Sequence, residues 1–575
     1  MIAPHLTLRV NFTHEDKAAK GLRSLREPQA APEPPVYFTA REAVDMFPRL
    51  LLLGERGSGK TVFARQLAAE TGATYIDLGA GLDLPAAGAL ILDGLDRIDG
   101  GLLAPLFKAI GDRPVVLLGD GAVVKAWKIP SNIAVHSLMP LDATERAAFL
   151  DVQNIAAPAA LSDAAGNPAL FALALTMSEP AQNAEDIVDV WLREAPEQAE
   201  TGFRALSAGT SINRAVDGLL AGYHLTTFDD AAVAKLFLAN SNLWAPSLAS
   251  LLRRKPERAS TIAPLLMAGD SDANLRGALL IADIVPDDPE VLARLRNLIE
   301  AGRLAPMDRN RAARILSIQG DPRDLEALCT IPGGRFTMGS TSHPNSQPVH
   351  QVGVEDFSIG RYPVTNALYA RFIAATGRKW VSPDADNPHK RNVPATDLTW
   401  HDARAYCDWL TIQWRSKGRI GPDQTVRLPT EPEWERASRG DMPDGGDEIV
   451  YPWGHGWNSD AANSEETGFN TPCATGLFPA GQSPYGCLDM AGQVWEWTTT
   501  LWGDDMATPH FTYPYADDGR EDLSAGPSIR RVLRGGCFSS TSLKACCSYR
   551  GSLEPDGFWR GNGFRIVVSG PANGA

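Results

Sequence analysis

Cysteine is missing from the first 328 residues of this 575-residue chain, and all seven cysteines lie at or after Cys329. No two of them form a C-x-x-C pair, which excludes the usual spacing of a structural zinc site. Without such a site, we expect most of these thiols to be buried packing residues in a reducing compartment. Their one-sided distribution indicates that two differently built halves are joined.

Long apolar runs and an excess of positive charge are also missing. No run approaches the roughly 18 apolar residues that cross a bilayer, and the first residues do not form a secretory signal. The formal net charge is −15, which argues against binding to nucleic acid or anionic membranes. We therefore expect a cytoplasmic protein with no nucleic-acid and no membrane partner.

Four segments of different composition follow one another along a chain that is too long for one hydrophobic core. Residues 1–35 end in the Pro-rich EPQAAPEPP and are expected to be a flexible tail. Residues 36–200 alternate apolar strands with helices, which predicts a parallel α/β sheet. Residues 201–328 contain amphipathic helices between Pro, Gly and Asp turns and resemble HEAT-type repeats. Residues 329–570 are rich in Trp, Gly and Pro, which predicts a loop-rich α+β domain.

The stretch GERGSGKT fits the phosphate-loop pattern G-x-x-x-x-G-K-[ST], with four leucines before it as a strand and VFARQLAAE after it as a helix. Glycines in such a loop let backbone N–H groups face phosphate oxygens, while the lysine neutralises β/γ charge and the hydroxyl ligates Mg²⁺. The sequence thus predicts a site for ATP or GTP with Mg²⁺. Its candidate residues are Gly54, Gly57, Gly59, Lys60 and Thr61.

A second apolar strand, GALILDGLDRI, delivers Asp93 to the magnesium side of this site. Thr61 and Asp93 are therefore the predicted metal ligands. Asp96, three residues later, is a candidate for orienting a water molecule, and the alternative is a solvated acid without a role. Asp93 and Asp96 are the candidate catalytic residues.

The phosphate loop, LDGLD, SLMPLDATERAAFL and GNPALFALAL together resemble the NACHT-like branch of the STAND nucleotide-switch ATPases. The resemblance covers about residues 36–200 and implies that Pro168 contacts the nucleotide. Many relatives end the fourth strand with a sensor arginine, whereas this chain has VVLLGDG. The resemblance therefore implies nucleotide binding with weak ATPase activity.

Further along, IPGGRFTMGS, VRLPTEPEWERASRG, PYGCLDMAGQVWEWT, RVLRGG and GFR resemble the formylglycine-generating enzyme family. The resemblance implies a C-type-lectin-like fold. Gly535 and Gly536 permit a close backbone approach. Tryptophans supply packing surface, and arginines are expected to pair with glutamates in a rigid frame, either buried or at the surface. These residues are Trp434, Trp453, Trp495, Trp497, Arg427, Arg534, Arg565, Glu433, Glu435 and Glu496.

Members of this family that oxidise cysteine bind copper through C-x-x-x-x-C. Here the segment reads CFSSTSLKACC, with Ser540 and Ala545 at the nearest equivalents and Cys546 one residue beyond. A single thiolate cannot bind copper(I) as two do, so oxidase activity is the alternative interpretation. Calcium near the WEW motif is a further candidate, although an asparagine of the relatives is replaced by Gln493 and only Asn463 and Asp489 remain as oxygen donors.

Variable proteins of diversity-generating retroelements share this fold and diversify the stretch between RVLRGG and GFR. The resemblance implies a display surface in which aromatic and small hydroxyl residues contact a protein or small-molecule ligand, and we expect Phe538, Tyr549, Phe558 and Trp559 to be exposed. The favoured function is a nucleotide-dependent ligand sensor that acts through an effector protein or homo-oligomer, and a passive scaffold is a third interpretation. The candidate ligand-binding residues are Cys537, Phe538, Ser539, Ser540, Thr541, Tyr549, Gly551, Ser552, Leu553, Phe558, Trp559 and Arg560.

Overall fold

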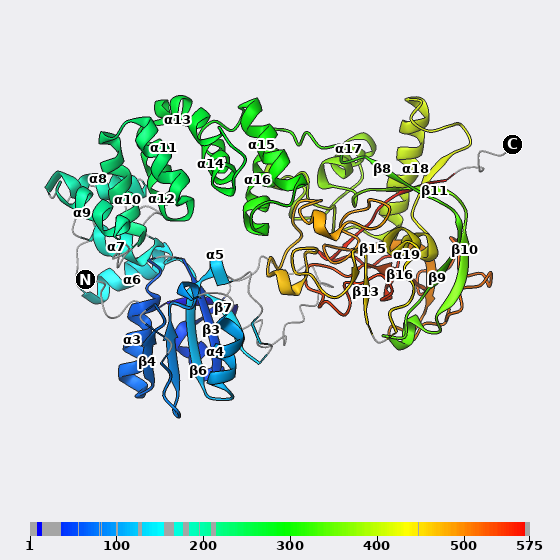
Figure 1. Cartoon of the computed structure of the whole chain (residues 1–575). Helices are drawn as coiled ribbons and strands as arrows, with labels where there is room; N and C mark the ends of the chain where they lie inside the picture. The colour runs from blue at the N-terminus through cyan, green and yellow to red at the C-terminus, as the bar shows by residue number, and fades with distance from the viewer. Residues whose placement is uncertain are drawn as a thin grey trace. The chain divides into compact units, whose positions relative to one another are not determined.

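The chain divides into two compact units, residues 1–284 and 285–575, in a computed structural model (Figure 1). Among the described residues, no helix is long and apolar enough to cross a membrane. The structure describes residues 8–13, 36–55, 57–79, 81, 83–98, 102–124, 129–130, 132–153, 166–175, 183–194, 196–208, 214–446 and 448–569.

A parallel five-stranded sheet is the centre of the first unit, as the alternating pattern predicts (Figure 1). The strands lie in the order β4-β5-β6-β3-β7. Leucines that alternate along β3 face opposite sides, where α3 (Lys60–Thr71) covers one face and α4 (Leu103–Ile110) the other. The strands are β3 (Arg49–Gly54), β4 (Thr74–Asp77), β5 (Leu90–Asp93), β6 (Val115–Asp120) and β7 (Ala134–Ser137).

The tail predicted to be flexible contains an ordered strand. β1 (Arg9–Thr13) pairs antiparallel with β2 (Tyr37–Thr39), which leads into α2 (Ala40–Met46). Val10 is fully buried, so apolar packing against the sheet holds this short segment. The rest of the tail lies outside the described residues.

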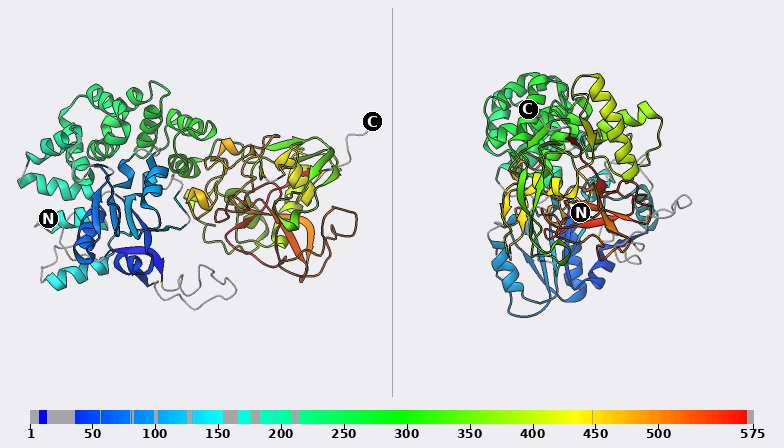
Figure 2. Two further views of the ribbon diagram at one scale, coloured as in Figure 1. Left: turned by 60° about the horizontal axis from the view of Figure 1, so that its bottom comes forward. Right: turned by 90° about the vertical axis from the view of Figure 1, so that its right-hand side faces the viewer.

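Helices follow the sheet and form a row that Figures 1 and 2 show from several directions. Neighbours in this row pack in pairs, such as α9 with α10 and α13 with α14. The predicted helical region is therefore present. These helices are α6 (Ala143–Gln153), α7 (Pro168–Ala174), α8 (Ala184–Glu194), α9 (Gln198–Ser207), α10 (Arg214–His224), α11 (Asp230–Ala239), α12 (Ser241–Arg254), α13 (Ala259–Leu266) and α14 (Asp272–Ala282), whereas the short α5 (Gly121–Val124) lies between β6 and β7.

The second unit begins with two helices, α15 (Pro289–Glu300) and α16 (Pro306–Gln319), that pack on each other. α16 is hydrogen-bonded to the domain that follows it: Ser317 Oγ donates to the carbonyl of Pro388 at 2.7 Å, and Asn392 Nδ2 donates to the carbonyl of Ala313 at 2.9 Å. The boundary predicted at residue 328 thus lies inside this unit.

Two four-stranded sheets build the C-terminal domain, in the orders β12-β19-β11-β8 and β17-β16-β15-β18. The last strand, β19, lies between β11 and β12, so the end of the chain closes a sheet that β8 begins. The strands are β8 (Leu328–Ile331), β9 (Gly334–Met338), β10 (His350–Val354), β11 (Phe357–Gly360), β12 (Thr425–Arg427), β13 (Val450–Tyr451), β14 (Gly454–His455), β15 (Trp495–Gly503), β16 (Arg530–Arg534), β17 (Gly551–Leu553), β18 (Asn562–Gly563) and β19 (Val567–Ser569).

Three helices complete this domain: α17 (Asn366–Thr376), α18 (Trp400–Ser416) and α19 (Glu431–Arg439). The largest apolar cluster joins α17 and α18 to β15, with Trp400 and Trp497 almost fully buried. Trp434 and Trp495 are also buried, and Trp453 is half-buried. The tryptophan packing expected from the sequence is confirmed.

Candidate functional site

The loop between β3 and α3 turns sharply at two glycines. Gly57 and Gly59 have φ values of 82° and 85°, a conformation that favours glycine. A Cβ atom on Gly57 would lie 2.6 Å from Asn167 Oδ1, so a larger residue there would displace the side chain that caps α7. The chain passes directly from the strand into the N-terminus of α3, the end of a helix that attracts anions.

Lys60 is the first residue of α3, and its ammonium lies inside this loop. Nζ donates to the carbonyls of Gly54 at 2.7 Å and Glu55 at 2.8 Å. Thr61 follows in the same helical turn and is half-buried. The predicted cation and hydroxyl are therefore both at the anion-attracting end of the helix.

Asp93 is the last residue of β5 and is only 2% exposed. Its carboxylate accepts a hydrogen bond from the Tyr75 hydroxyl at 3.1 Å. Because β3 and β5 run parallel on either side of β6, the ends of β3 and β5 lie at the same edge of the sheet. Asp96 Oδ1 accepts from the backbone N–H of Asp120 at 2.8 Å, which ties this carboxylate to the end of β6.

The start of α7 contacts the glycine loop, where the resemblance places Pro168. Asn167 caps this helix, and the N–H of Ala169 lies 3.3 Å from the carbonyl of Gly57. The β-carbon of Pro168 lies 4.0 Å from the position of a Cβ on Gly59. The structure thus brings Gly57, Gly59 and Pro168 together across more than a hundred residues of sequence.

In the C-terminal domain, the three predicted arginine–glutamate pairs all form. Two of the arginines, Arg534 and Arg565, are fully buried, whereas Arg427 keeps a third of its side chain exposed. The pairs are Arg427–Glu433 (2.7 and 2.5 Å), Arg534–Glu435 (2.5 Å) and Arg565–Glu496 (2.6 and 2.7 Å).

Sequence reasoning missed a further buried pairing centred on Glu431. This carboxylate accepts from Arg534 at 2.9 Å and from Arg550 at 2.7 and 3.0 Å, and all three side chains are fully buried. Burial opposes ionisation, but the two guanidinium groups hold the pKa of Glu431 below its usual value. The available signal was EPEWE, three glutamates in one helical turn that need several cations.

Residues 537–560 lie in the sequence between two of these buried arginines, Arg534 and Arg565. Gly535 and Gly536 adopt φ values of 92° and 74°, and a Cβ on Gly535 would lie 3.1 Å from the Trp434 ring. Of the predicted ligand-binding residues, Ser539, Thr541 and Phe558 are exposed; Tyr549, Gly551, Ser552, Leu553, Trp559 and Arg560 are half-buried; Cys537, Phe538 and Ser540 are buried.

The expectation of four exposed aromatic residues is wrong for Phe538, which is 7% exposed, and holds fully only for Phe558 at 43%. Phe538 belongs to the main apolar cluster, and the Trp559 ring lies 6.5 Å from it. The Tyr549 ring lies 6.0 Å from Trp495. These rings turn inward because the buried surface around β15 offers more apolar contact than water does.

The cysteines at the end of this segment point into the protein. Cys546 donates to the carbonyl of Leu543 at 3.5 Å, and Cys547 accepts from the Ser438 hydroxyl at 3.1 Å. Burial raises the pKa of Cys546, and it raises that of Cys547 to about 12. Both thiols are therefore protonated at neutral pH, and they have different partners.

Gln493 occupies the place expected for calcium. Its fully buried amide donates to the carbonyl of Cys473 at 2.9 Å and accepts from the Cys473 N–H at 3.0 Å and from Asn463 Nδ2 at 2.8 Å. Asp489 accepts instead from the N–H of Gly476 at 2.7 Å. Because N–H donors converge where a cation needs oxygen atoms, these residues do not fit calcium.

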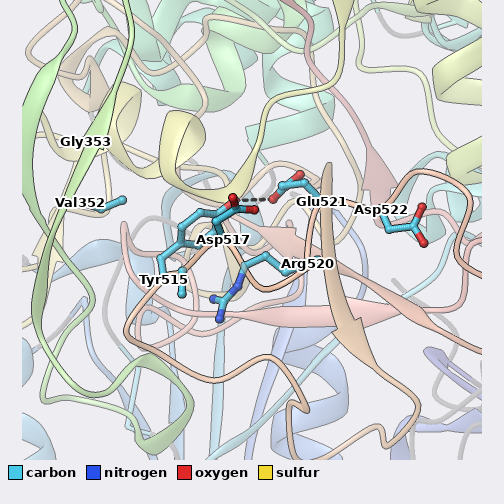
Figure 3. A pocket seen from close by; sticks show the side chains of 9 residues that line it. Val352, Gly353, Tyr515, Asp517, Arg520, Glu521 and Asp522 are labelled. Atoms are coloured by element: carbon cyan, nitrogen blue, oxygen red, sulfur yellow. Dashed lines mark hydrogen bonds between the residues drawn. The ribbon is translucent and has the colours of Figure 1, made fainter.

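A cleft of about 470 Å³ lies beside β10 (Figure 3). Val352, Gly353 and residues 515–517 and 519–522 line it. The Glu521 carboxylate accepts from the hydroxyls of Tyr515 and Thr499, each at 2.5 Å. Burial raises the pKa of Glu521, and these hydroxyls oppose the shift. The sequence gives no signal for this cleft, because its walls come from distant segments.

The family model that matches this chain falls within the second unit. A family model described as "Sulfatase-modifying factor enzyme 1-like domain" matches residues 316–569. The formylglycine-generating enzyme of Mycobacterium tuberculosis is 32% identical over 266 residues, covering 37% of this chain and 86% of that protein. Hercynine oxygenase of Mycolicibacterium smegmatis is 30% identical over 318 residues, covering 49% of this chain and 69% of that protein. The structure of Treponema denticola variable protein 1 covers 42% of this chain and 94% of its own, with 22% identity and a TM-score of 0.33.

Proposed function

This chain belongs to the family of sulfatase-modifying factor enzyme 1-like proteins, and from that premise we propose that its C-terminal domain displays a ligand-binding surface instead of oxidising cysteine. We further propose that the first unit binds ATP or GTP, so that the protein is a nucleotide-dependent ligand sensor. The single observation that carries the proposal is the replacement of the paired copper cysteines by Ser540 and Ala545, with the neighbouring thiols turned inward.

Copper(I) needs converging thiolates. Ser540 is buried and its hydroxyl accepts from the backbone N–H of Cys537 at 3.0 Å, and Ala545 has no ligating atom. Cys546 and Cys547 keep their protons, because burial raises the pKa of each thiol. The copper-binding relatives bind copper through two cysteines at this position. Here the same position offers no pair of thiolates to copper(I).

The same segment instead offers exposed side chains on a rigid support. Leu543 is 64% exposed and Phe558 43%, and aromatic side chains among small polar ones suit a surface that contacts a ligand. Glu465 N–H donates to the carbonyl of Ser540 at 3.0 Å, and the Ser542 N–H donates to Glu466 at 2.7 Å. The exposed residues are Ser539, Thr541, Leu543, Lys544, Asp556 and Phe558, a mixture that suits a protein or a small polar ligand.

The nucleotide part of the proposal rests on the edge of the sheet at β3 and β5. In this proposal Lys60 neutralises phosphate charge, and Thr61 and Asp93 supply the hard oxygen donors that Mg²⁺ prefers. Mg²⁺, when bound, neutralises charge on the β- and γ-phosphates. Hydrolysis is expected to be weak, because β6 ends in Gly119 and Asp120 without a sensor arginine and Asp96 is held by the Asp120 N–H.

A sensor requires that ligand affinity differ between nucleotide states. We propose that the ATP-bound and ADP-bound forms differ in their affinity for an effector protein or for a second copy of the chain. A cytoplasmic setting suits such a nucleotide switch.

Anaerobic titration with copper(I) against a chelating dye tests the display proposal. We expect no tight site at the end of the segment, because two converging thiolates are missing there. One equivalent of copper that is lost in Cys546→Ser but kept in Cys407→Ser, together with oxygen consumption on a thiol peptide, would make the domain an oxidase. Cys407→Ser is the matched control because it removes a buried thiol elsewhere in the domain.

A further inference from the structure

Two cysteines from distant parts of the domain meet in its second apolar cluster. Cys329 lies on β8, the edge strand of its sheet, and Cys487 lies in the turn before β15. Both belong to the cluster that also holds Trp434 and Met490. The Cys329 sulfur lies 3.7 Å from the position that a Cβ on Gly486, the neighbour of Cys487, would occupy, so the two thiols come close together within this cluster.

One guanidinium group, that of Arg565 with its ion-pair partner Glu496, lies beside this thiol pair. Arg565 donates to the carbonyls of Gly360 at 2.8 Å and Leu488 at 3.0 Å, which belong to the strand beside Cys329 and to the residue after Cys487. Interaction with the Cys487 thiol, and then the charge of Arg565, lower the pKa of the Cys329 thiol against the opposing effect of burial, while the same interaction and burial raise the pKa of Cys487. One sulfur is thus prepared as a thiolate nucleophile and the other as a neutral thiol.

The other described cysteines lack this arrangement. Burial raises the pKa values of Cys407 and Cys473 well above that of an ordinary thiol. The Cys546 and Cys547 thiols, although adjacent in sequence, bond to Leu543 and to Ser438 and not to each other. Cys537 lies 3.3 Å from the Ser539 hydroxyl.

We propose that Cys329 and Cys487 form a redox-active dithiol that a hydroperoxide closes to a disulfide, fastening β8 to the turn before β15. The Cys329 thiolate attacks the peroxide oxygen, becomes a sulfenic acid and releases hydroxide. The Cys487 thiol then attacks that sulfur, forms the S–S bond and releases water. Two electrons pass from the sulfurs to the peroxide, and a dithiol reductant reverses the change.

The position of the bond gives it a structural consequence. β8 is the strand through which the chain enters the domain from α16, and it pairs with β11 alone within the described sheet. A disulfide there would close a long loop of the unfolded chain, which raises stability. We infer that the disulfide holds β8, through which the chain arrives from α16, more rigidly than the two free thiols do.

Peptide mapping of the full chain tests this proposal without any variant. Reduced protein is treated with hydrogen peroxide, remaining thiols are alkylated, and disulfide-linked peptides are identified by mass spectrometry. We expect a Cys329–Cys487 link as the main product, reversed by dithiothreitol, with the melting temperature of the domain raised by roughly 5–10 °C. A chain that shows no such link, or links other cysteines in preference, would overturn the proposal.

Two variants sharpen the result. In Cys487→Ser, the melting-temperature rise should vanish and a sulfenic acid should be trapped on Cys329 by dimedone, whereas Cys473→Ser should behave like the wild type. Alkylation of Cys329 should proceed with an apparent pKa below the roughly 8.5 of a free thiol. If Cys329 is alkylated as slowly as the buried Cys407 at every pH, the dithiol does not exist.

Discussion

Replacing Glu431 with alanine is expected to unfold the C-terminal domain or to reduce its free energy of unfolding by at least about 3–5 kcal/mol, because it removes one partner of a fully buried ion pair. Glu431 is the shared counterion of Arg534 and Arg550, and all three side chains are fully buried. Since natural domains are stable by only about 5–15 kcal/mol, such a loss is close to the whole stability of the domain. Urea titration followed by circular dichroism measures it.

Glu448→Ala is the matched control, because the Glu448 side chain is 73% exposed and its ion-pair partner among the described residues is His455. Its loss should cost no more than about 0.5 kcal/mol. The Glu431 effect should also depend on pH: because the folded-state pKa of Glu431 is lowered, the stability that it contributes is present above its unfolded pKa and is lost as the pH falls through the folded value. Equal losses from Glu431→Ala and Glu448→Ala would show that the buried pairing does not support the domain.

Lys60→Ala is expected to weaken the binding of a fluorescent ATP analogue by at least about 100-fold, because it removes a charge-assisted contact to the phosphates. Its ammonium lies at the loop carbonyls of Gly54 and Glu55, and no other lysine lies in the glycine loop. Asp93→Asn should reduce hydrolysis more than binding, because it acts on the magnesium position.

Lys108→Ala, on the exposed face of α4, is the matched control and should bind the analogue as the wild type does. Equal affinity in Lys60→Ala and Lys108→Ala would remove the glycine loop as the nucleotide site. The unfolding transition of both variants should be recorded as well, so that a loss of binding is separated from a loss of fold.

The sequence predicted local features better than it predicted long-range partners. The glycine loop between β3 and α3 follows from leucines, glycines and a helical pattern within two dozen residues. Arg427 and Glu433 are six residues apart, and Glu433 also caps α19 with Thr430, so their pairing has a local cause. Glu431 and Arg550 are separated by 119 residues, and no local pattern in the sequence specifies that contact.

Burial in the 537–560 segment could not be predicted for the same reason. Phe538 and Trp559 have no periodic neighbours, and their exposure depends on a surface built by α18 and β15. Gln493 has a positive φ and fills its site with a side-chain amide. The sequence showed that an asparagine was replaced, but only the structure shows that the amide takes over the hydrogen bonds at that point.

Simultaneous replacement of the exposed segment residues tests the display account most directly. The variant carries alanine at Ser539, Thr541, Leu543, Lys544 and Phe558, and its free energy of unfolding is measured by urea titration beside the wild type. Exposed positions usually contribute within about 0.5 kcal/mol each, so the account predicts a total change of no more than about 2.5 kcal/mol for the five positions and an unchanged transition slope. A loss as large as that of Glu431→Ala would show that the segment is part of the core, and the display account would then be wrong.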